Sequence, residues 1–202
     1  MFYNSCFMTI VMPPRPKLTK SKIIEAVLKI IEENGSTQIS ARNISDELKC
    51  STAPIYTLYS SMKEIERDAL IRSQEMLIES MKVSYTDREF LNMGTGIVIF
   101  ARDHSNLYKF LYHEGLNFKS EHKQLTLMFE EIMISDPRFT DMPKDLRDEL
   151  LHTMWTYTHG LASFSTERII QNLSNDLIIQ ELERVGWIVI GYYMKEWKEG
   201  IE

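Results

Sequence analysis

The sequence predicts an all-α fold of about nine helices, on three observations. Only 8 Gly and 6 Pro occur in 202 residues, so strong helix breakers are few. Apolar residues recur three and four positions apart in one segment after another, which is the period of an amphipathic helix. No long segment alternates apolar and polar residues with the period of two that a half-buried strand requires.

The N-terminal part of the chain predicts a tail followed by three helices. Residues 1–17 are expected to form a disordered extension and a basic arm that contacts phosphate or stays solvated. A first helix is expected over about residues 18–34, ended by Gly35, because its isoleucines and valine share one face. The second helix is expected to begin at Ser40 and the third at Ser51, both good N-cap residues.

The later helices are expected between one capping or breaking residue and the next. Gly94 and Gly96 fall inside the fifth helix, where each costs about 1 kcal/mol relative to Ala and is expected to permit a close helix crossing or a kink. The expected segments are residues 62–85 after the caps Ser60 and Ser61, residues 87–101 capped by Asp87, and residues 107–113, 120–135, 143–172 and 175–198.

Composition narrows the class of protein. Apolar residues make up 44% of the chain and charged residues 26%, which is ordinary for a soluble globular protein. Cys6 and Cys50 lie far apart in unlike surroundings, which argues against a disulfide or a metal site and fits a cytoplasmic location. The uncharged run over residues 1–12 is too short to span a membrane, so no membrane partner is expected.

Charge divides the chain into two unequal parts. Residues 13–62 contain seven Lys/Arg and five Asp/Glu, a net charge of +2, whereas residues 63–202 contain 16 and 24, a net charge of −8. A small basic head on an acidic body is typical of a DNA-binding domain joined to a regulatory domain, although chance also produces differences of this size. We therefore expect a DNA-binding head over residues 18–64 and a helical regulatory and dimerisation domain over residues 65–202.

Two short helices joined by a tight turn over residues 40–59 predict a helix-turn-helix, whose second helix enters the major groove of DNA. Residues 19–66 also resemble the DNA-binding head of the TetR family, the tetracycline-repressor-like regulators. This resemblance rests on the order and spacing of Gly35, Ile39-Ser40, Arg42, Ile44, Leu48, Ser51, Ile55-Tyr56, Tyr59 and Lys63-Glu64-Ile65. In the body, Trp155 with His159-Gly160-Leu161-Ala162, and Asp103-His104-Ser105-Asn106-Leu107-Tyr108, resemble stretches of several branches of the family.

Three positions of the head depart from the family's usual pattern. Lys49 stands in the turn where Gly is usual, and a left-handed backbone there costs Lys roughly 1 kcal/mol more than Gly. Leu58 replaces a His or Tyr that helps to hold a phosphate, and Met62 replaces the Lys at the start of the fourth helix. The departures predict fewer phosphate contacts than the family usually makes.

The exposed face of the third helix predicts the DNA contacts. Thr52 and Thr57 offer hydroxyls for base edges or phosphates and methyl groups for thymine. Because no Arg, Asn or Gln lies on this helix, Arg42 is the best candidate for guanine or phosphate, and Tyr56 for phosphate. Each position is otherwise an ordinary exposed one. The candidate DNA contacts are Lys22, Arg42, Ser51, Thr52, Ala53, Pro54, Tyr56, Thr57 and Lys63.

The resemblance implies a regulator, most commonly a repressor, that binds a palindromic operator as a homodimer. The last two helices would form a four-helix dimer interface; the alternative is a helix pair in a monomeric core. The candidate interface residues are Thr156, Gly160, Ser163, Ile178, Leu182, Val185, Gly186 and Val189.

Helices four to eight are expected to enclose a pocket for an unidentified small apolar or amphipathic effector, because few charges are predicted to point inward. Met and aromatic residues at helical spacing are otherwise plain core. The candidate pocket residues are Phe100, His104, Tyr108, Met128, Met133, Trp155 and Tyr157.

Two other classes of protein compete with this interpretation. An enzyme is disfavoured, because the chain has no phosphate-binding Gly loop, no His-Glu-x-x-His and no nucleophile elbow, and no catalytic residue or cofactor is expected. His152 and His159 share a helix face without a third ligand nearby, so no metal site is expected either. The second alternative is a helical adaptor that keeps the fold and has lost specific operator binding, as Leu58 and Met62 suggest.

Overall fold

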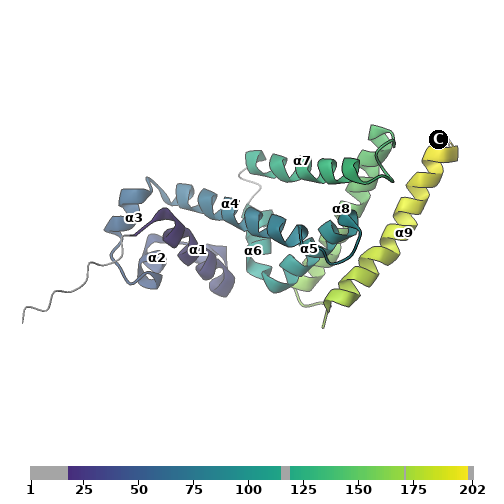
Figure 1. The fold of residues 1–202 in the computed structure, drawn as a ribbon. Helices are drawn as coiled ribbons and strands as arrows, with labels where there is room; N and C mark the ends of the chain where they lie inside the picture. The colour runs from purple at the N-terminus through teal and green to yellow at the C-terminus, as the bar shows by residue number, and fades with distance from the viewer. Residues whose placement is uncertain (1–17, 115–118, 171, 200–202) are drawn as a thin grey trace, which may run out of the picture.

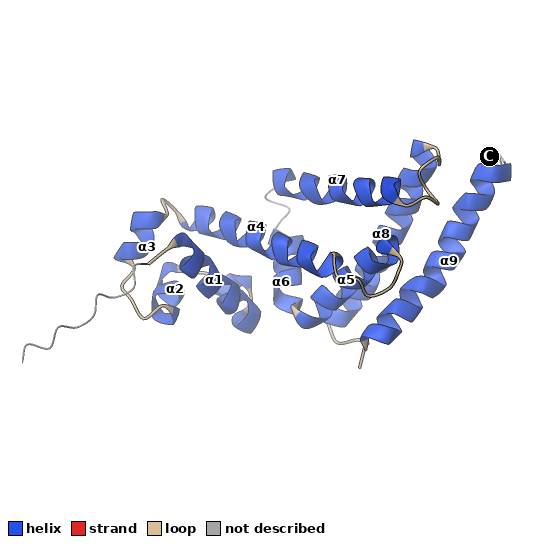
Figure 2. Cartoon of the chain, viewed as in Figure 1, coloured by secondary structure: helices blue, strands red, loops and turns tan. Residues whose placement is uncertain are grey.

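The computed structural model describes residues 18–114, 119–170 and 172–199, and every regular element within those ranges is helical (Figure 2). The all-α prediction is therefore confirmed. The elements are α1 (Lys20–Asn34), η1 (Ser36–Gln38), α2 (Ala41–Glu47), α3 (Ala53–Leu58), α4 (Met62–Met81), α5 (Glu89–Asp103), α6 (Ser105–Lys109), η2 (Phe110–Glu114), α7 (Lys119–Ser135), α8 (Lys144–Thr166) and α9 (Asn175–Glu199). Helices α1 to α3 gather at one end of the molecule, α4 leads from them into the body, and α9 lies at the far end (Figure 1).

Side-chain caps set the beginnings of three helices. The Thr19 hydroxyl accepts a hydrogen bond from the backbone N–H of Lys22 at 3.3 Å before α1, and Ser40 caps α2 in the same way. Ser61 caps α4 by accepting from the Glu64 N–H at 3.3 Å. Gly35 ends α1 with a φ of 82°, a backbone conformation that glycine adopts without strain.

Two predicted caps were wrong. Helix α3 begins after Thr52, which makes no side-chain cap, so Ser51 is not the N-cap. Helix α5 begins after Arg88, so Asp87 lies outside the helix and does not cap it. In both cases the helix begins one residue later than predicted, and neither Thr52 nor Arg88 makes a side-chain cap.

Three predicted helix boundaries were also wrong. Helix α4 ends at Met81 instead of near residue 85, and α8 ends at Thr166 instead of near residue 172. The backbone of Arg168 has a φ of 54°, which no right-handed helix can continue through. The sixth helix begins at Ser105, two residues before the predicted start, and passes into the π-helical segment η2.

Helices α4 and α5 cross in very close contact at Gly96. A Cβ atom on Gly96 would lie 2.4 Å from the Ser80 carbonyl oxygen, and the Ser80 hydroxyl donates to the Gly96 carbonyl at 2.9 Å. A Cβ atom added to Gly94 would instead lie at ordinary van der Waals distances from its neighbours. The predicted close crossing is therefore confirmed for Gly96.

The head and the body are joined by direct hydrogen bonds as well as by α4. The Asn106 amide on α6 donates to the backbone carbonyl of Glu32 on α1 at 2.8 Å. The His104 ring nitrogen Nδ1 hydrogen-bonds the Glu32 carboxylate. These bonds connect the start of α6 directly to the C-terminal end of α1.

Candidate DNA-binding surface and effector cavity

Helix α3 has one buried face and one free face. Ile55 and Tyr59 are 0% and 1% exposed, so they hold the helix against the core, whereas Tyr56 is 53% exposed. Thr52, Ala53 and Thr57 are exposed beside it, and Pro54 is half-buried. This is the orientation that leaves a recognition helix free to enter a groove.

The end of α3 is fixed to α4 through Tyr59. The Tyr59 hydroxyl donates to the Asp68 carboxylate at 2.9 Å, and the Lys20 ammonium lies 4.3 Å from the ring centroid. Lys20 also pairs with Glu64 at 3.1 Å. Burial, together with the hydrogen bond to Asp68, raises the pKa of Tyr59 above its ordinary value. The hydroxyl therefore stays protonated and serves as a permanent donor.

The charged DNA-contact candidates are all exposed to solvent. Arg42 on α2, Lys22 on α1 and Lys63 on α4 are exposed, and no ion pair in the described part of the chain engages them. Ser51 is exposed in the turn before α3.

The Thr57 hydroxyl donates within α3 to the Ala53 carbonyl at 3.1 Å, so the oxygen and the methyl group of Thr57 remain available for contacts outside the protein. Lys49 has a φ of 51°, which places this lysine in the left-handed conformation expected of the usual Gly. The predicted basic arm lies outside the described residues.

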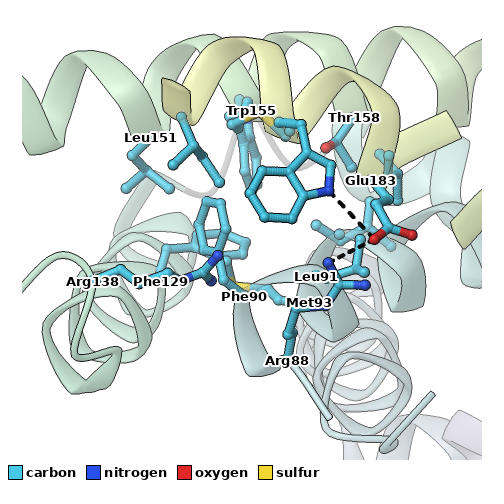
Figure 3. A pocket seen from close by; sticks show the side chains of 17 residues that line it. Arg88, Phe90, Leu91, Met93, Phe129, Arg138, Leu151, Trp155, Thr158 and Glu183 are labelled. Atoms are coloured by element: carbon cyan, nitrogen blue, oxygen red, sulfur yellow. Dashed lines mark hydrogen bonds and ion pairs between the residues drawn. The ribbon is translucent and has the colours of Figure 1, made fainter. Parts of the chain in front are cut away.

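An apolar cavity opens in the body among α5, α7, α8 and α9 (Figure 3). Its space amounts to about 670 Å³, including solvent at its mouth. The walls are mainly aromatic and aliphatic. The apolar side chains are Phe90, Leu91, Met93, Ile97, Phe129, Leu151, Met154, Trp155, Leu182, Trp187 and Ile190, with Gly94, Thr158 and Gly186 between them.

Three ionisable side chains also line the apolar cavity. Arg88 pairs with Glu183 at 2.8 Å, and the Trp187 indole N–H donates to the same carboxylate at 3.4 Å. These hydrogen bonds, the one from Arg88 first, lower the pKa of Glu183. The Arg138 guanidinium donates hydrogen bonds to the Asp136 carboxylate, which is mostly buried and does not line the cavity. Burial opposes ionisation of Asp136, but hydrogen bonds from the Arg138 side chain and backbone outweigh it and lower the pKa.

The predicted pocket residues do not form one wall. Trp155 lines the apolar cavity, Tyr108 lines a separate polar cavity with His159, and Phe100 and His104 line a third cavity near Ser80. The others are placed as follows: Met133 is fully buried, Met128 is half-buried, and Tyr157 donates to Glu181 at 3.3 Å. No sequence pattern pointed to Arg88 or Arg138 as cavity residues, because which residues face a cavity depends on how four helices pack.

A buried aromatic cluster separates the apolar cavity from the polar one. The Trp155 and His159 rings lie 4.1 Å apart between centroids, and the Tyr108 hydroxyl and His159 Nδ1 form a hydrogen bond. Burial lowers the pKa of His159 to about 4, so the imidazole is neutral at pH 7. Its Nε2 atom is buried and has no hydrogen-bond partner among the described residues.

The predicted dimer face is divided by the packing of α9. Ile178, Leu182 and Gly186, which were predicted for the dimer interface, are buried within the protomer against α5 and α8 and do not lie on its surface. The other residues remain available at the surface: Thr156 and Ser163 are exposed, and Gly160, Val185 and Val189 are partly exposed. The apolar side chains exposed along these two helices are Phe164, Leu177, Trp187, Ile188 and Tyr192, which sequence reasoning missed.

Searches for a metal site and for a membrane span found neither in the described residues. No group of three or more His, Cys, Asp or Glu side chains in that part of the chain is arranged to hold a metal ion. No helix there is both long enough and apolar enough to cross a bilayer.

Comparison with known proteins identifies the fold. Neither a protein-family model nor a curated protein sequence matches the chain. Among solved structures, a TetR-like transcriptional regulator from Rhodococcus sp. RHA1 matches with a TM-score of 0.65 and 14% sequence identity, over 87% of this chain and 98% of that one. The chain therefore has the fold of a TetR-like transcriptional regulator, and the resemblance noted in the sequence is confirmed as a likeness of fold.

Proposed function

We propose that the protein is a DNA-binding transcriptional repressor that binds a palindromic operator as a homodimer and is released by a small apolar or amphipathic effector. The observation that supports this most strongly is the free face of α3, where the exposed Tyr56 stands opposite the buried Ile55. Lys22, Arg42 and Lys63, on the neighbouring helices α1, α2 and α4, are exposed cations that suit the phosphates beside a groove.

A dimer is part of the proposal because one head reads only a few base pairs. The exposed apolar side chains of α8 and α9, with Phe164, Ile188 and Tyr192 among them, offer a surface for a second copy. Light scattering should give about twice the protomer mass of 23.7 kDa at micromolar concentration. A mass of one protomer would refute the dimer.

Effector release is proposed to act through α6. A ligand in the body would favour one position of α6, and the bonds from His104 and Asn106 to Glu32 would pass that preference to the head. The two heads of a dimer would then no longer match the spacing of the operator half-sites.

The test is an electrophoretic mobility shift with the promoter DNA beside the gene. Tyr56→Ala should weaken binding of the dimer roughly a hundredfold, because each of its two heads loses one hydrogen bond to a charged phosphate, worth about 1.5 kcal/mol. Lys82→Ala, an exposed residue at the opposite end of α4, is the control and should bind as the wild type does. Unchanged affinity in Tyr56→Ala would remove that contact from the proposal.

An adaptor protein without operator binding is the second candidate. Leu58 and Met62 pack partly buried against the core and offer no polar group to a phosphate. If the wild type binds no specific DNA at near-physiological salt, the adaptor is favoured and the repressor is refuted.

A further inference from the structure

The apolar cavity has two arginines among its apolar walls. In Figure 3 Arg88 and Arg138 lie on the lower side of the cavity, where Phe90 and Phe129 also lie, and Trp155 lies on the upper side. The apolar walls suit a hydrocarbon or aromatic body, whereas the two guanidinium groups do not. A ligand that fits both regions has an apolar body and a polar end.

The charge of that end follows from the ionisable groups of the lining. Two arginines and one glutamate line the cavity, so the lining has a net charge of +1. Arg88 and Glu183 neutralise each other at 2.8 Å. Asp136, which is not part of the lining, pairs with Arg138 at 2.6 Å, so each arginine has one carboxylate partner and the preference for an anion depends on the donors that Arg138 leaves unused.

Arg138 also has unused donors. Its Nε and Nη2 atoms donate to the Asp136 carboxylate at 3.0 and 2.6 Å, which fixes the plane of the guanidinium. No hydrogen bond among the described residues uses Nη1. A guanidinium held along one edge still offers the Nη1–Nη2 edge, which matches the two oxygens of a carboxylate.

We propose that the apolar cavity binds an amphipathic monocarboxylate, with the carboxylate on the free edge of Arg138 and the apolar body against the packed pair Phe129 and Trp155 and the neighbouring apolar walls. This inference rests on the proposed function, because it names the chemical class of the effector. An ammonium ligand is disfavoured since Glu183, the acidic group that lines the cavity, already accepts hydrogen bonds from Arg88 and Trp187.

The test measures binding by titration calorimetry on the full chain without DNA, using octanoate, octylamine and 1-octanol. The three probes share one hydrocarbon body and differ only in the charge of the head. Octanoate should bind at least about tenfold tighter than either of the others, which is the effect of one charge-assisted hydrogen-bonded pair. Octylamine binding as tightly as octanoate, or no octanoate binding at millimolar concentration, would overturn the proposal.

Variants separate the carboxylate contact from general effects on folding. Arg138→Gln should weaken octanoate binding about tenfold and leave octanol binding unchanged, because only the charged edge is lost. Glu183→Gln should strengthen octanoate binding, since Arg88 loses its competing partner. Arg184→Gln is the matched control, because Arg184 lies next to Glu183 on α9 but outside the cavity. It should change neither octanoate binding nor octanol binding.

Two safeguards keep the result decisive. If Arg138→Gln fails to fold, because the Arg138 side chain also compensates the mostly buried Asp136 carboxylate, the Glu183→Gln variant still tests the sign of the charge preference. Equal losses for octanoate and octanol in Arg138→Gln, or weaker octanoate binding in Glu183→Gln, would refute the carboxylate contact. Since these titrations contain no DNA, their failure is distinguishable from failure of the mobility shifts that test the repressor.

Discussion

Gly96→Ala is predicted to destabilise the protein although alanine is the better helix former. The added Cβ would lie 2.4 Å from the Ser80 carbonyl oxygen and 2.6 Å from the Met81 Cα atom. Both neighbours are backbone atoms of α4, so no side chain can rotate away to make room. Helices α4 and α5 would have to separate by roughly 1 Å to restore an ordinary contact.

The magnitude follows from opposing contributions. Forcing an extra carbon into a packed contact costs about 1–3 kcal/mol, and losing the 2.9 Å hydrogen bond from Ser80 to Gly96 costs about 1 kcal/mol more. Higher helix propensity returns about 1 kcal/mol. The net loss is about 1–3 kcal/mol, equivalent to a fall in Tm of roughly 2–12 °C for a chain of this size.

Urea unfolding and thermal melting at fixed protein concentration measure the effect. Gly94→Ala is the matched control on the same helix, because its Cβ would meet Leu182 and Thr158 at 3.5 and 3.6 Å, ordinary contact distances. It should be neutral or up to about 1 kcal/mol more stable than the wild type. A Gly96→Ala protein with a midpoint at or above that of the wild type would refute the close crossing.

Three further predictions concern stability, each measured by urea unfolding. Ser61→Ala removes the side-chain cap of α4 and should cost about 1 kcal/mol; no loss would show that Ser61 is not the cap. Arg102→Ala removes donors to Leu173 and Asn175 at 2.9 and 2.8 Å and should cost about 1–3 kcal/mol, unless water replaces the guanidinium, in which case the midpoint stays constant. Burial lowers the pKa of His159 to about 4 from an ordinary 6.5, so the unfolded chain binds the extra proton first as pH falls. Stability should therefore decline between about pH 6.5 and 4, by up to about 3 kcal/mol, and His159→Gln should flatten that slope; an unchanged slope would assign it to other groups.

Local sequence signals were sufficient for most of the head. Thr19 and Ser40 cap the helices they precede, and Gly35 ends α1 with a positive φ. Ile44 and Ile55 are buried as their helical spacing predicted. These features depend on interactions within four residues of the chain, so the sequence alone contains the information.

The same local reasoning failed where two neighbours were equally suitable. Ser51 and Thr52 are both residue types that cap helices, and each of the two helices begins one residue after the predicted cap, without a side-chain cap. It failed again for α9, whose apolar residues surround the helix on several sides. Ile178 and Leu182 could face either the protomer core or a second copy, and only contact with α5 and α8 decides between these alternatives.

The sequence by itself therefore determined the helical class, the helix-turn-helix with its exposed Tyr56, and the likeness to TetR-type heads. The tertiary structure decided which face of α9 is buried, where the apolar cavity opens, and that Arg88 and Arg138 line it. The physical reason is range. Caps and helical periodicity act between residues within a turn or two, whereas a cavity wall joins side chains from α5, α7, α8 and α9 whose directions are fixed only when all four helices pack together.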